Sequence, residues 1–421
     1  MIAYTLWRGR LPCGEKRAIM PCMNRGDDMR KILVLAGFVL AMALMGTAAL
    51  AEPAAEMTQG CVIRTKDNKV LRSLQDGDYT SMWSAYGDMA RLTVTALDEE
   101  RIHGVYVQFY NYSCAFDVQV KDADRKWQTV ASCDGAYLSG YAALPEGVQE
   151  IRIRPQSNAD RLSIAEVHVF GAGDVPKWVQ QWEPAHEKAD LLLISAHPDD
   201  EILFMGGTIP YYAGEKQKAV QVAYLVPATP YRKLELLDGL WLCGVRNYPE
   251  IGNFPDYFSS SIRGMYQKDG WSESQVLDYI TWLYRRYRPD VVLTHDTNGE
   301  YGHGAHKVAA DIAQKAIVTA ADEGYRFKKE KALPVWSIKK LYLHLFEQGK
   351  IRMDWRVPLA AFDGKTAFEM AEAAFQCHVS QLNTEYKVED CGPYDNSVFG
   401  LAYTDVGEDV SKNDFFEHIG M

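Results

Sequence analysis

The hydrophobic pattern changes once along the chain after its first fifty residues. Residues 57 to about 173 contain short runs in which apolar and polar residues alternate, and turn residues separate the runs, as in DADRK (122–126) and LPEG (144–147). These runs are ARLTVTAL (90–97), HGVYVQFYN (103–111), AFDVQVKD (115–122), EIRIRP (150–155) and IAEVHVFG (164–171). Alternation with a period of two is typical of strands that bury one face. The regular spacing of the runs predicts a β-sandwich over 57–173.

A second pattern begins near Ala189. LLLIS (191–195) is a continuous apolar run, as expected of a strand that is covered on both faces. Further strands are predicted at 220–226, 290–295 and 339–346. Helical patterns lie between them at 201–214, with an end near Pro210, and at 231–245, 274–287 and 306–321. Strands that alternate with helices predict an α/β domain over 187–421, with a Rossmann-like, wound and mostly parallel sheet.

The stretch GAGDVPKWVQQWEP, residues 171–184, separates the two patterns and contains Gly, Asp and Pro. Such residues favour turns and connecting segments. We therefore predict a linker over 174–186. A length of 421 residues agrees with two domains.

The beginning of the chain has the pattern of an export signal. Two basic residues precede the apolar run Ile32–Met45, and a small-residue segment that fits the A-x-A cleavage pattern ends at Ala51. The run is shorter than the roughly 20 residues that a membrane-spanning helix needs. We expect 1–51 to be a leader with a signal peptide, and Met29 to be the true start. The mature chain would then be secreted, extracellular or in the cell envelope, without an integral membrane segment; an uncleaved anchor is the alternative.

Composition narrows the class of partner. The formal net charge is -11, and 47% of the residues are hydrophobic, which is ample for a core. The acidic balance argues against nucleic acid, which requires a basic surface. It also argues against docking on an anionic membrane surface. A neutral glycan stays compatible with this charge.

Eight cysteines occur in the chain, and none forms a C-x-x-C pair, which argues against a thiolate zinc site. Export would permit disulfides. Cys114 with Cys133, or Cys377 with Cys391, are close enough in sequence to be candidates.

Two polar clusters follow predicted strands of the α/β part. AHPDDE (196–201) comes directly after the strand at 191–195, and YGHGAH (301–306) follows the strand at 290–295. In wound α/β sheets, ligands bind beyond the carboxyl ends of the strands. Imidazole and carboxylate together suit zinc, and a catalytic zinc site needs three protein ligands and an open position. The sequence therefore predicts a zinc site assembled from both clusters.

Taken together, the two clusters resemble the PIG-L, or LmbE-like, de-N-acetylases. These are zinc hydrolases that remove acetyl from N-acetylglucosamine-type groups. The resemblance covers roughly 187–421. It implies one Zn²⁺ in the catalytic domain, with His197, Asp200 and His306 as its ligands.

The resemblance also implies roles for the other polar residues. Asp199 corresponds to the general base, His303 to the histidine that polarises the amide carbonyl, and Tyr301 to a tyrosine that helps to hold the intermediate. Arg232 and Asp256 stand where the family has substrate-contacting residues. Gly304-Ala305 stand where many members have Pro-Asp, and HVSQ (378–381) resembles a C-terminal family feature without a role that we assign.

The chemistry explains why two adjacent aspartates are needed. Zinc makes water acidic enough to act as a nucleophile near neutral pH. A carboxylate must take the proton of that water, and Asp199 cannot be base and ligand at once. The alternative for Asp199 is that it only caps the following helix, since Asp is a preferred N-cap residue. Glu201 is expected to support the helix start or the residues behind the metal ligands, and His295 to lie behind the ligands or to be structural.

The β-rich part also has a resemblance. The loop LQDGDYTSMW (74–83), followed by VYVQFYN, FDVQV and IAEVHVFG, is similar to the discoidin-type, galactose-binding-like jelly roll. Such domains often bind glycans, which implies a second glycan contact through this domain. Aromatic rings pair well with the apolar faces of sugars. The candidate rings are Trp83, Tyr86, Tyr110, Tyr112 and Tyr137; the alternative is that they fill the core or the sheet edges.

These observations lead to one main functional hypothesis. The chain is expected to be a secreted zinc-dependent N-deacetylase that acts on an N-acetylated amino sugar in a glycan or glycoconjugate. One alternative is a zinc amidase that acts on another amide. The other alternative is a secreted carbohydrate-binding protein whose catalytic domain is idle.

Overall fold

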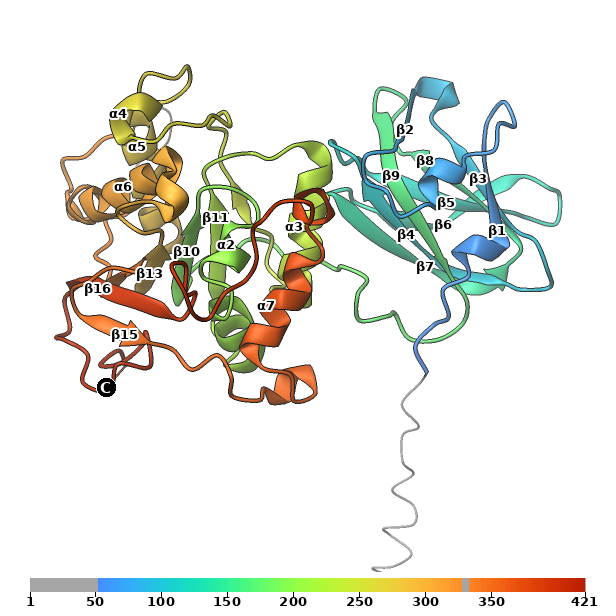
Figure 1. Ribbon diagram of the computed structural model, residues 1–421. Helices are drawn as coiled ribbons and strands as arrows, with labels where there is room; N and C mark the ends of the chain where they lie inside the picture. The colour runs from blue at the N-terminus through green and yellow to red at the C-terminus, as the bar shows by residue number, and fades with distance from the viewer. Residues whose placement is uncertain (1–51, 328–332, 421) are drawn as a thin grey trace, which may run out of the picture. The chain divides into compact units, whose positions relative to one another are not determined.

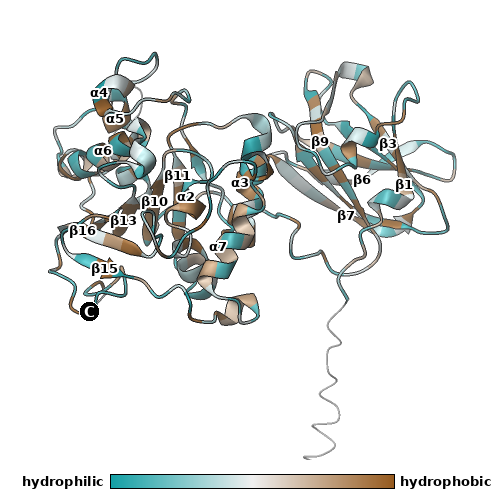
Figure 2. Ribbon diagram, in the orientation of Figure 1, coloured by the Kyte–Doolittle hydropathy of each residue, from teal (hydrophilic) through white to brown (hydrophobic). Residues whose placement is uncertain are grey.

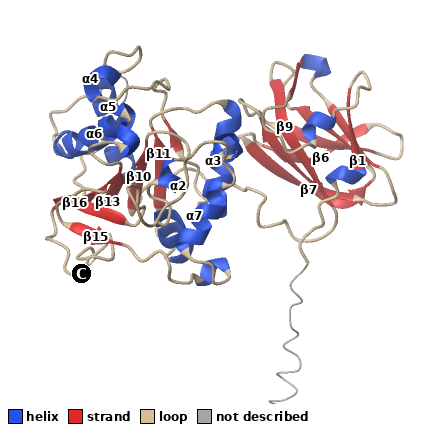
Figure 3. Ribbon diagram, viewed as in Figure 1, coloured by secondary structure: helices blue, strands red, loops and turns tan. Residues whose placement is uncertain are grey.

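The computed structural model describes residues 52–327 and 333–420. From Pro53 onward, the chain forms one compact unit. Figure 3 shows that strands dominate the first part of this unit and that helices and strands alternate in the second part. The predicted leader and signal peptide, 1–51, lie outside the described residues. The predicted domain limits at 57–173, 174–186 and 187–421 stay predictions.

The first part contains two antiparallel sheets. The five-stranded sheet has the order β1-β3-β8-β5-β6. Its strands are Cys61–Thr65 (β1), Leu92–Ala96 (β3), Glu150–Pro155 (β8), Phe116–Lys121 (β5) and Trp127–Cys133 (β6). The four-stranded sheet has the order β2-β9-β4-β7. Its strands are Trp83–Tyr86 (β2), Arg161–Phe170 (β9), Ile102–Phe109 (β4) and Ser139–Val148 (β7).

Alternating burial explains how these two sheets pack. In β3 and β8 every second residue is buried, which matches the alternation of apolar residues in the sequence. Buried residues of both sheets, such as Val94 and Val107, belong to one core. The layered, sandwich-like arrangement therefore follows from the pattern, whereas the jelly-roll resemblance stays a prediction.

Strand β7 differs from the prediction. It runs through Leu144-Pro145-Glu146-Gly147, which the sequence suggested was a turn. β7 lies at the edge of its sheet, and its pairing with β4 is irregular between Ile102 and Gly104. Proline is tolerated on edge strands and next to bulges because no ladder hydrogen bond is lost there.

The second part is built around a mixed seven-stranded sheet with the order β12-β11-β10-β13-β14-β16-β15. Its strands are Glu250–Ile251 (β12), Val220–Tyr224 (β11), Leu191–Ser195 (β10), Val291–Thr294 (β13), Lys340–His344 (β14), Val398–Thr404 (β16) and Lys350–Arg352 (β15). The first five strands pair in parallel, and β16 pairs antiparallel with β14 and β15. The wound α/β class is thus confirmed, with an antiparallel edge that the sequence did not predict.

Helices cover both faces of this sheet (Figure 1). The α-helices are Asp200–Leu203 (α2), Pro230–Leu242 (α3), Ile262–Met265 (α4), Glu273–Tyr287 (α5), Gly304–Ala321 (α6) and Ala367–Phe375 (α7). Leu192 and Ile194 of β10 share a core with α5 and α6. Leu191 and Leu193 share the other core with α2, α3 and α7. Both faces of β10 are therefore buried, and Figure 2 shows the central strands as hydrophobic.

Short helical turns complete the described secondary structure. The 3-10 turns are Thr58–Gly60, Arg72–Leu74, Gly87–Met89, Glu300–Gly302, Ala360–Phe362 and Val379–Gln381, and Pro210–Glu215 forms a π-helical turn. The helical pattern predicted over 201–214 is therefore interrupted, and the end predicted near Pro210 is wrong because the π-helical turn begins there. A Cβ on Gly207 would lie 2.3 Å from Cδ2 of Trp355, and a Cβ on Gly206 would lie 2.1 Å from the carbonyl oxygen of Ile202. The glycine pair allows this close packing and disfavours a continuous helix.

The order of the strands positions the two polar motifs. The chain leaves β10 for β11 and β12 on one side and then enters β13 on the other side of β10. This reversal is a topological switch point, where wound sheets place their ligand sites. The segments that follow β10 and β13 therefore meet at the same edge of the sheet.

The described residues bear on two predictions from the sequence, one about disulfide bonds and one about membrane-spanning helices. The six cysteines from Cys61 to Cys391 are all free thiols, so neither candidate disulfide forms. The Cys377 thiol instead faces the carbonyl of Ala373, at 3.9 Å within its own helical segment. Within 52–327 and 333–420, no helix combines the length and the apolar character needed to cross a bilayer.

Candidate active site

The side chains of three predicted ligands converge at the tips of β10 and β13. Nδ1 of His197 lies 2.9 Å from Oδ2 of Asp200, and Nε2 of His306 lies 3.1 Å from the same oxygen. The two ring nitrogens are 3.2 Å apart. His197 and Asp200 lie at the turn into α2, whereas His306 lies in the first turn of α6. The backbone N–H of His197 also donates to Oδ2 of Asp200, which fixes the turn.

This triangle of donor atoms fits a divalent cation. Three atoms about 3 Å apart can all lie about 2 Å from one point, which is the usual length of Zn–N and Zn–O bonds. Two imidazoles and one carboxylate are ligand types that zinc accepts. Two further imidazoles lie close by, because His303 groups with His197 and His306, and His295 groups with Asp200 and His306.

Asp199 stands beside this cluster and does not act as a helix cap. Its backbone has φ 112°, in the left-handed region, and its side chain makes no capping hydrogen bond. Oδ2 of Asp199 instead lies 3.1 Å from Nη2 of Arg232. A non-glycine residue in this conformation is strained, and such strain is often found at functional sites. The capping alternative for Asp199 is therefore wrong.

The two adjacent aspartates differ in their electrostatics. Burial and the neighbouring Asp200 carboxylate raise the pKa of Asp199 well above its ordinary value, against the opposing effect of the Arg232 guanidinium. Burial also opposes ionisation of Asp200. The imidazoles of His306 and His197 outweigh burial and hold the pKa of Asp200 well below its ordinary value. One carboxyl group is therefore suited to take up a proton, and the other to stay anionic.

His303 is held by the start of α6. Its Nδ1 accepts a hydrogen bond from the backbone N–H of Ala305, at 3.1 Å. Because Nδ1 is an acceptor, the proton of the neutral ring is on Nε2. Burial, together with the imidazoles of His197 and His306, lowers the pKa of His303 to about 3. The ring is thus neutral, with one N–H available to donate.

Close packing against a loop explains the glycine that follows His303. The N–H of Gly304 donates to the carbonyl of Ser259, at 2.5 Å. A Cβ on Gly304 would lie 2.7 Å from that oxygen and 2.9 Å from the carbonyl oxygen of Ser261. A proline at this position would lose the hydrogen bond and clash with the loop. A glycine at position 304 therefore suits the close packing against this loop. The backbone N–H of Ala305 still holds the His303 ring in place.

The remaining predicted residues also lie at the cluster. The hydroxyl of Tyr301 is 3.5 Å from Nε2 of His306. Nη2 of Arg232 donates to the carbonyl of Pro198, at 2.6 Å. Oδ1 of Asp256 is 3.8 Å from Nε2 of His197, and the Asp256 side chain is 58% exposed. The structure thus brings all eight predicted site residues together, with Asp256 at the solvent side.

Sequence reasoning overlooked Glu300, which lies directly behind the cluster. Its carboxylate is fully buried and contacts the imidazoles of His295, His306 and His344. A usable signal was present, because His295 follows β13 and His344 ends β14, the next parallel strand. Polar residues at the ends of neighbouring parallel strands meet at one edge of the sheet.

The HVSQ segment lies behind the first motif. His378 is fully buried, and its Nε2 is 3.8 Å from Oε1 of Glu201. The other oxygen of Glu201 accepts from the backbone N–H of Asp199, as expected for a residue that supports the turn. Burial raises the pKa of Glu201 to about 8. The backbone N–H and the hydroxyl of Ser380 donate to Glu235 of α3, so these hydrogen bonds attach the HVSQ segment to that helix.

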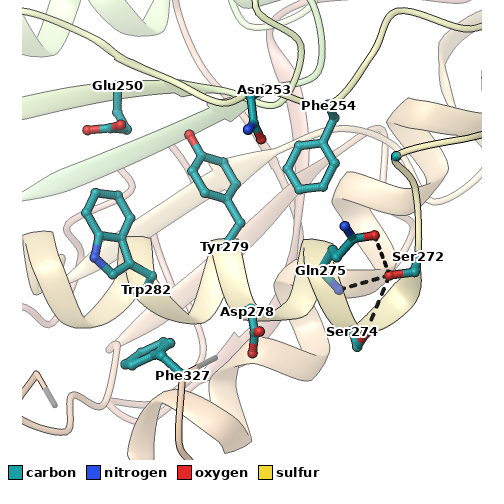
Figure 4. A pocket seen from close by; sticks show the side chains of 11 residues that line it. Glu250, Asn253, Phe254, Ser272, Ser274, Gln275, Asp278, Tyr279, Trp282 and Phe327 are labelled. Carbon is teal, nitrogen blue, oxygen red and sulfur yellow. Dashed lines mark hydrogen bonds between the residues drawn. The ribbon is translucent and has the colours of Figure 1, made fainter. Parts of the chain in front are cut away.

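A separate cavity of about 490 Å³ is lined by residues of α5 and of the loop after β12 (Figure 4). Its walls include the rings of Phe254, Tyr279 and Trp282. The hydroxyl of Tyr279 already donates to the carbonyl of Tyr224, at 3.0 Å. No predicted site residue lines this cavity, so it is distinct from the polar cluster.

Comparison with known proteins identifies relatives of the second part. Residues 192–317 match the PIG-L family, described as GlcNAc-PI de-N-acetylase. A 1D-myo-inositol 2-acetamido-2-deoxy-alpha-D-glucopyranoside deacetylase of Streptomyces scabiei is 30% identical in an alignment of 187 residues, which covers 38% of this chain and 57% of that protein. A protein of the same description from Geodermatophilus obscurus is 25% identical in an alignment of 279 residues, which covers 54% of this chain and 90% of that protein.

The extent of these matches differs between relatives. The chain spans only 57% of the Streptomyces scabiei protein. Among solved structures, a conserved protein of Thermus thermophilus has a TM-score of 0.34 at 21% identity, over 46% of this chain and 80% of that chain. A family 89 glycoside hydrolase of Clostridium perfringens has a TM-score of 0.25 at 17% identity, over 32% of this chain and 16% of that chain. The family match itself includes both strand-end motifs.

Proposed function

We propose that this chain is a secreted, zinc-dependent N-deacetylase that acts on an N-acetylglucosamine-type sugar in a glycan or glycoconjugate. The observation that carries the proposal is the convergence of His197, Asp200 and His306 within 3.2 Å, beside Asp199. The family match and the acetylated glucosamine substrate in the names of the relatives support this type of reaction. The export-like pattern at 1–51 supports secretion.

The donor atoms Nδ1 of His197, Oδ2 of Asp200 and Nε2 of His306 would hold the cation. When bound, a zinc ion supplies a Lewis acid that polarises a carbonyl oxygen and lowers the pKa of water. Asp200 is suited to this role because it stays anionic. The three side chains leave the side of Asp256 open to solvent, where the substrate would enter.

Asp199 would act as the general base. Its carboxylate would take the proton from the attacking water and later give it to the leaving amine. The raised pKa of Asp199 favours proton uptake at this carboxyl group. Arg232 fixes the orientation of the carboxylate through its contact with Oδ2. The division between Asp199 and Asp200 gives one residue for proton transfer and one for the cation.

His303 and Tyr301 would stabilise the negative charge that develops on the amide oxygen. The neutral His303 ring has its proton on Nε2, because Nδ1 accepts from Ala305. A positioned donor of this kind contributes a rate factor of about 10² to 10³. Tyr301 adds a hydroxyl next to His306.

An exposed aromatic ring lies beside this donor. Phe258 is 67% exposed, and its ring centroid is 5.1 Å from that of His303. Aromatic rings pair well with the apolar face of a pyranose. Phe258 and the exposed Asp256 would together form a rim that accepts a sugar ring, with its acetamido group directed at the cluster.

The direct test uses the purified chain with Zn²⁺ and a panel of N-acetylhexosamine oligosaccharides. We expect release of acetate and of free amine from at least one substrate, and none after the metal is removed by a chelator. Asp199→Ala should abolish turnover and keep the bound zinc. Loss of zinc in this variant would contradict the base assignment, and the absence of release from the whole panel would contradict the deacetylase proposal.

A further inference from the structure

Glu300 is a buried carboxylate whose hydrogen-bonding capacity is fully used. Its Oε2 lies 2.8 Å from Nδ1 of His295 and 2.8 Å from Nδ1 of His306. Its Oε1 lies 2.6 Å from Nδ1 of His344 and 3.1 Å from the backbone nitrogen of Asp296. A carboxylate has about four lone-pair sites, and four donors surround this one. None of these contacts belongs to the reaction described above.

The opposite nitrogens of two of these rings define where their protons are. Nε2 of His295 accepts from the backbone N–H of Ala196, at 2.9 Å, so His295 carries its proton on Nδ1 and donates to Glu300. Nε2 of His344 faces the carbonyl of Asp395, at 3.1 Å, and donates to it, so Nδ1 donates to Glu300 as well when the ring carries both protons. Glu300 is therefore held from β13 and from β14 at the same time.

The third ring connects Glu300 to the candidate metal site. Nδ1 of His306 donates to Glu300, which leaves the lone pair of Nε2 directed at His197 and Asp200. The rings of His295 and His306 are stacked, with centroids 4.1 Å apart and an interplanar angle of 27°. Phe204 packs against this group, with its centroid 5.8 Å from that of His306. The ring of His306 is thus restrained on three sides.

We propose that Glu300 is a positioning residue of the metal site, which fixes the tautomer and the ring orientation of His306 and is itself locked by His295 and His344. This inference rests on the proposed role of His306 as a metal ligand. Hydrogen bonds from a ligating imidazole to a carboxylate typically change metal affinity by about 10- to 100-fold. Because Glu300 accepts from Nδ1 of His306, Nε2 of that ring carries no proton and its lone pair is already available to the cation.

The contacts of Glu300 support an ionised carboxylate. Its two oxygens face three imidazole nitrogens and one backbone N–H, so each oxygen meets two hydrogen-bond donors. A buried carboxylate is tolerated only when such partners compensate for the loss of water. A neutral amide at this position would have one acceptor oxygen instead of two, so it could not accept from all four donors.

The chain offers a matched control, a second buried carboxylate that contacts the same strand, β14, as Glu300 does. Asp409 is a buried carboxylate that pairs with Lys340 and accepts from the hydroxyl of Tyr342, at 2.6 Å. Lys340 and Tyr342 lie in β14, as His344 does. Within the described part of the chain, the Asp409 carboxylate contacts no member of the metal cluster, so its loss should affect stability alone.

The test compares Glu300→Gln with Asp409→Asn in the full-length protein. Zinc affinity is measured by competition with a chelator, under conditions where each variant is folded. We expect Glu300→Gln to bind Zn²⁺ about 10- to 100-fold more weakly than the unmodified protein. Asp409→Asn should lower the melting temperature of the metal-free protein and leave the zinc affinity unchanged. Equal zinc affinity of Glu300→Gln and the unmodified protein would overturn the inference.

If Glu300→Gln does not fold, a second variant tests whether Glu300 positions His306. His344→Phe keeps a ring in place and removes one donor to Glu300, so its zinc affinity should fall by a factor at the lower end of the same range. An unchanged affinity in this variant would overturn the inference. Zinc binding needs no substrate, so a failure of Glu300 to position the metal can be told apart from a failure of the deacetylase proposal.

Discussion

The two antiparallel sheets of residues 61–170 and the seven-stranded sheet of residues 191–404 differ in how many charged side chains they bury and where these side chains lie. In the first part, Glu166 is the one carboxylate buried among the described residues. In the second part, buried histidines and carboxylates gather where β10, β13 and β14 end. Alternating strands direct polar residues to solvent, whereas strands that are apolar on both faces leave polar residues only at their ends. Buried contacts between histidines and carboxylates at strand ends therefore mark the candidate site of the second part, whereas the buried Lys340–Asp409 pair lies outside it.

The strongest test of this difference replaces one histidine in each part. His303→Ala should lower kcat/KM by about 10² to 10³, because the donor to the amide oxygen is lost. It should also cost about 1 kcal/mol of stability, because His303 caps α6. His168→Ala, in β9, should leave kcat/KM unchanged. Acetate release and thermal unfolding measure both variants.

Zinc content gives this comparison a second outcome. His303 also lies within a group that could hold a cation, together with His197 and His306. His303→Ala should nevertheless retain one zinc ion, because Asp200 completes the proposed ligand set. Loss of zinc would make His303 a ligand, and an equal loss of activity in His168→Ala would remove the contrast between the two parts.

A smaller effect is expected from Arg232, whose charge faces Asp199 at 3.1 Å. The guanidinium lowers the pKa of Asp199 against the stronger effect of burial, so Arg232→Met should raise this pKa further. A base must be deprotonated to act, so the acid limb of the pH profile of kcat/KM should move to higher pH. A shift of one unit lowers activity about tenfold below the new pKa.

The neighbouring cation provides the control for Arg232. Lys233→Met makes the same change in net charge one residue further along α3, and Lys233 has no ion pair with Asp199. Its pH profile should match that of the unmodified protein. A profile of Arg232→Met that stays in place would show that Arg232 does not act on the base.

The main features of the site could be predicted because strand ends are visible in the sequence. His197, Asp200 and His306 follow continuous apolar runs, and wound topology brings such ends together. Glu300 could be predicted only in part, because the sequence shows polar residues at the ends of the strands that become β13 and β14 but not what they contact. Its role depends on β14 being the next strand after β13 and on the direction of the His344 side chain, which no hydrophobic pattern shows.

Errors in the predicted fold have a similar physical origin. The helix predicted over 201–214 is interrupted because Gly207 packs against Trp355, which is distant in the sequence. The expected turn at 144–147 is part of β7 because an edge strand tolerates proline. In both cases a tertiary contact or a sheet position overrode the local signal.

Glu166 allows a test of buried charge in the first part. Burial, with a hydrogen bond that the protonated Glu166 donates to the Asp76 carboxylate, raises the pKa of Glu166 to about 8. The unfolded chain releases this proton near the ordinary value of 4.5, so the folded state holds more protons between pH 4.5 and 8. The free energy of unfolding must therefore fall as the pH rises through this window. Glu166→Gln should remove this contribution and reduce the drop in melting temperature between pH 5 and pH 8, by about 2–4 °C for each kcal/mol that the group contributes.

The exposed Glu146→Gln, in β7 of the same part, is the control for that measurement. It should leave the pH dependence of the melting temperature unchanged. A slope in Glu166→Gln equal to that of the unmodified protein would mean that Glu166 is not the proton-holding group. Activity should be unaffected in both variants, because neither residue lies at the candidate metal site.

The smallest expected effect concerns the proposed glycan contact of the first part. Trp83, Tyr110 and Tyr137 pack against the core, so the packing alternative fits these three rings. Tyr86 and Tyr112 are 59% and 62% exposed and are the rings most accessible to a sugar, although the Arg161 guanidinium already lies over the Tyr86 ring, 5.1 Å from its centroid. A stacking contribution of about 0.5–1.5 kcal/mol corresponds to a factor of about 2 to 10 in affinity.

Tyr86→Ala with Tyr112→Ala should raise KM for a polymeric glycan by this factor and leave kcat unchanged. Kinetics on a monosaccharide should not change, since such a substrate reaches only the metal cluster, and the equally exposed Leu97→Ala should leave both substrates unaffected. Equal effects on polymer and monosaccharide would instead assign these tyrosines to the stability of the first part.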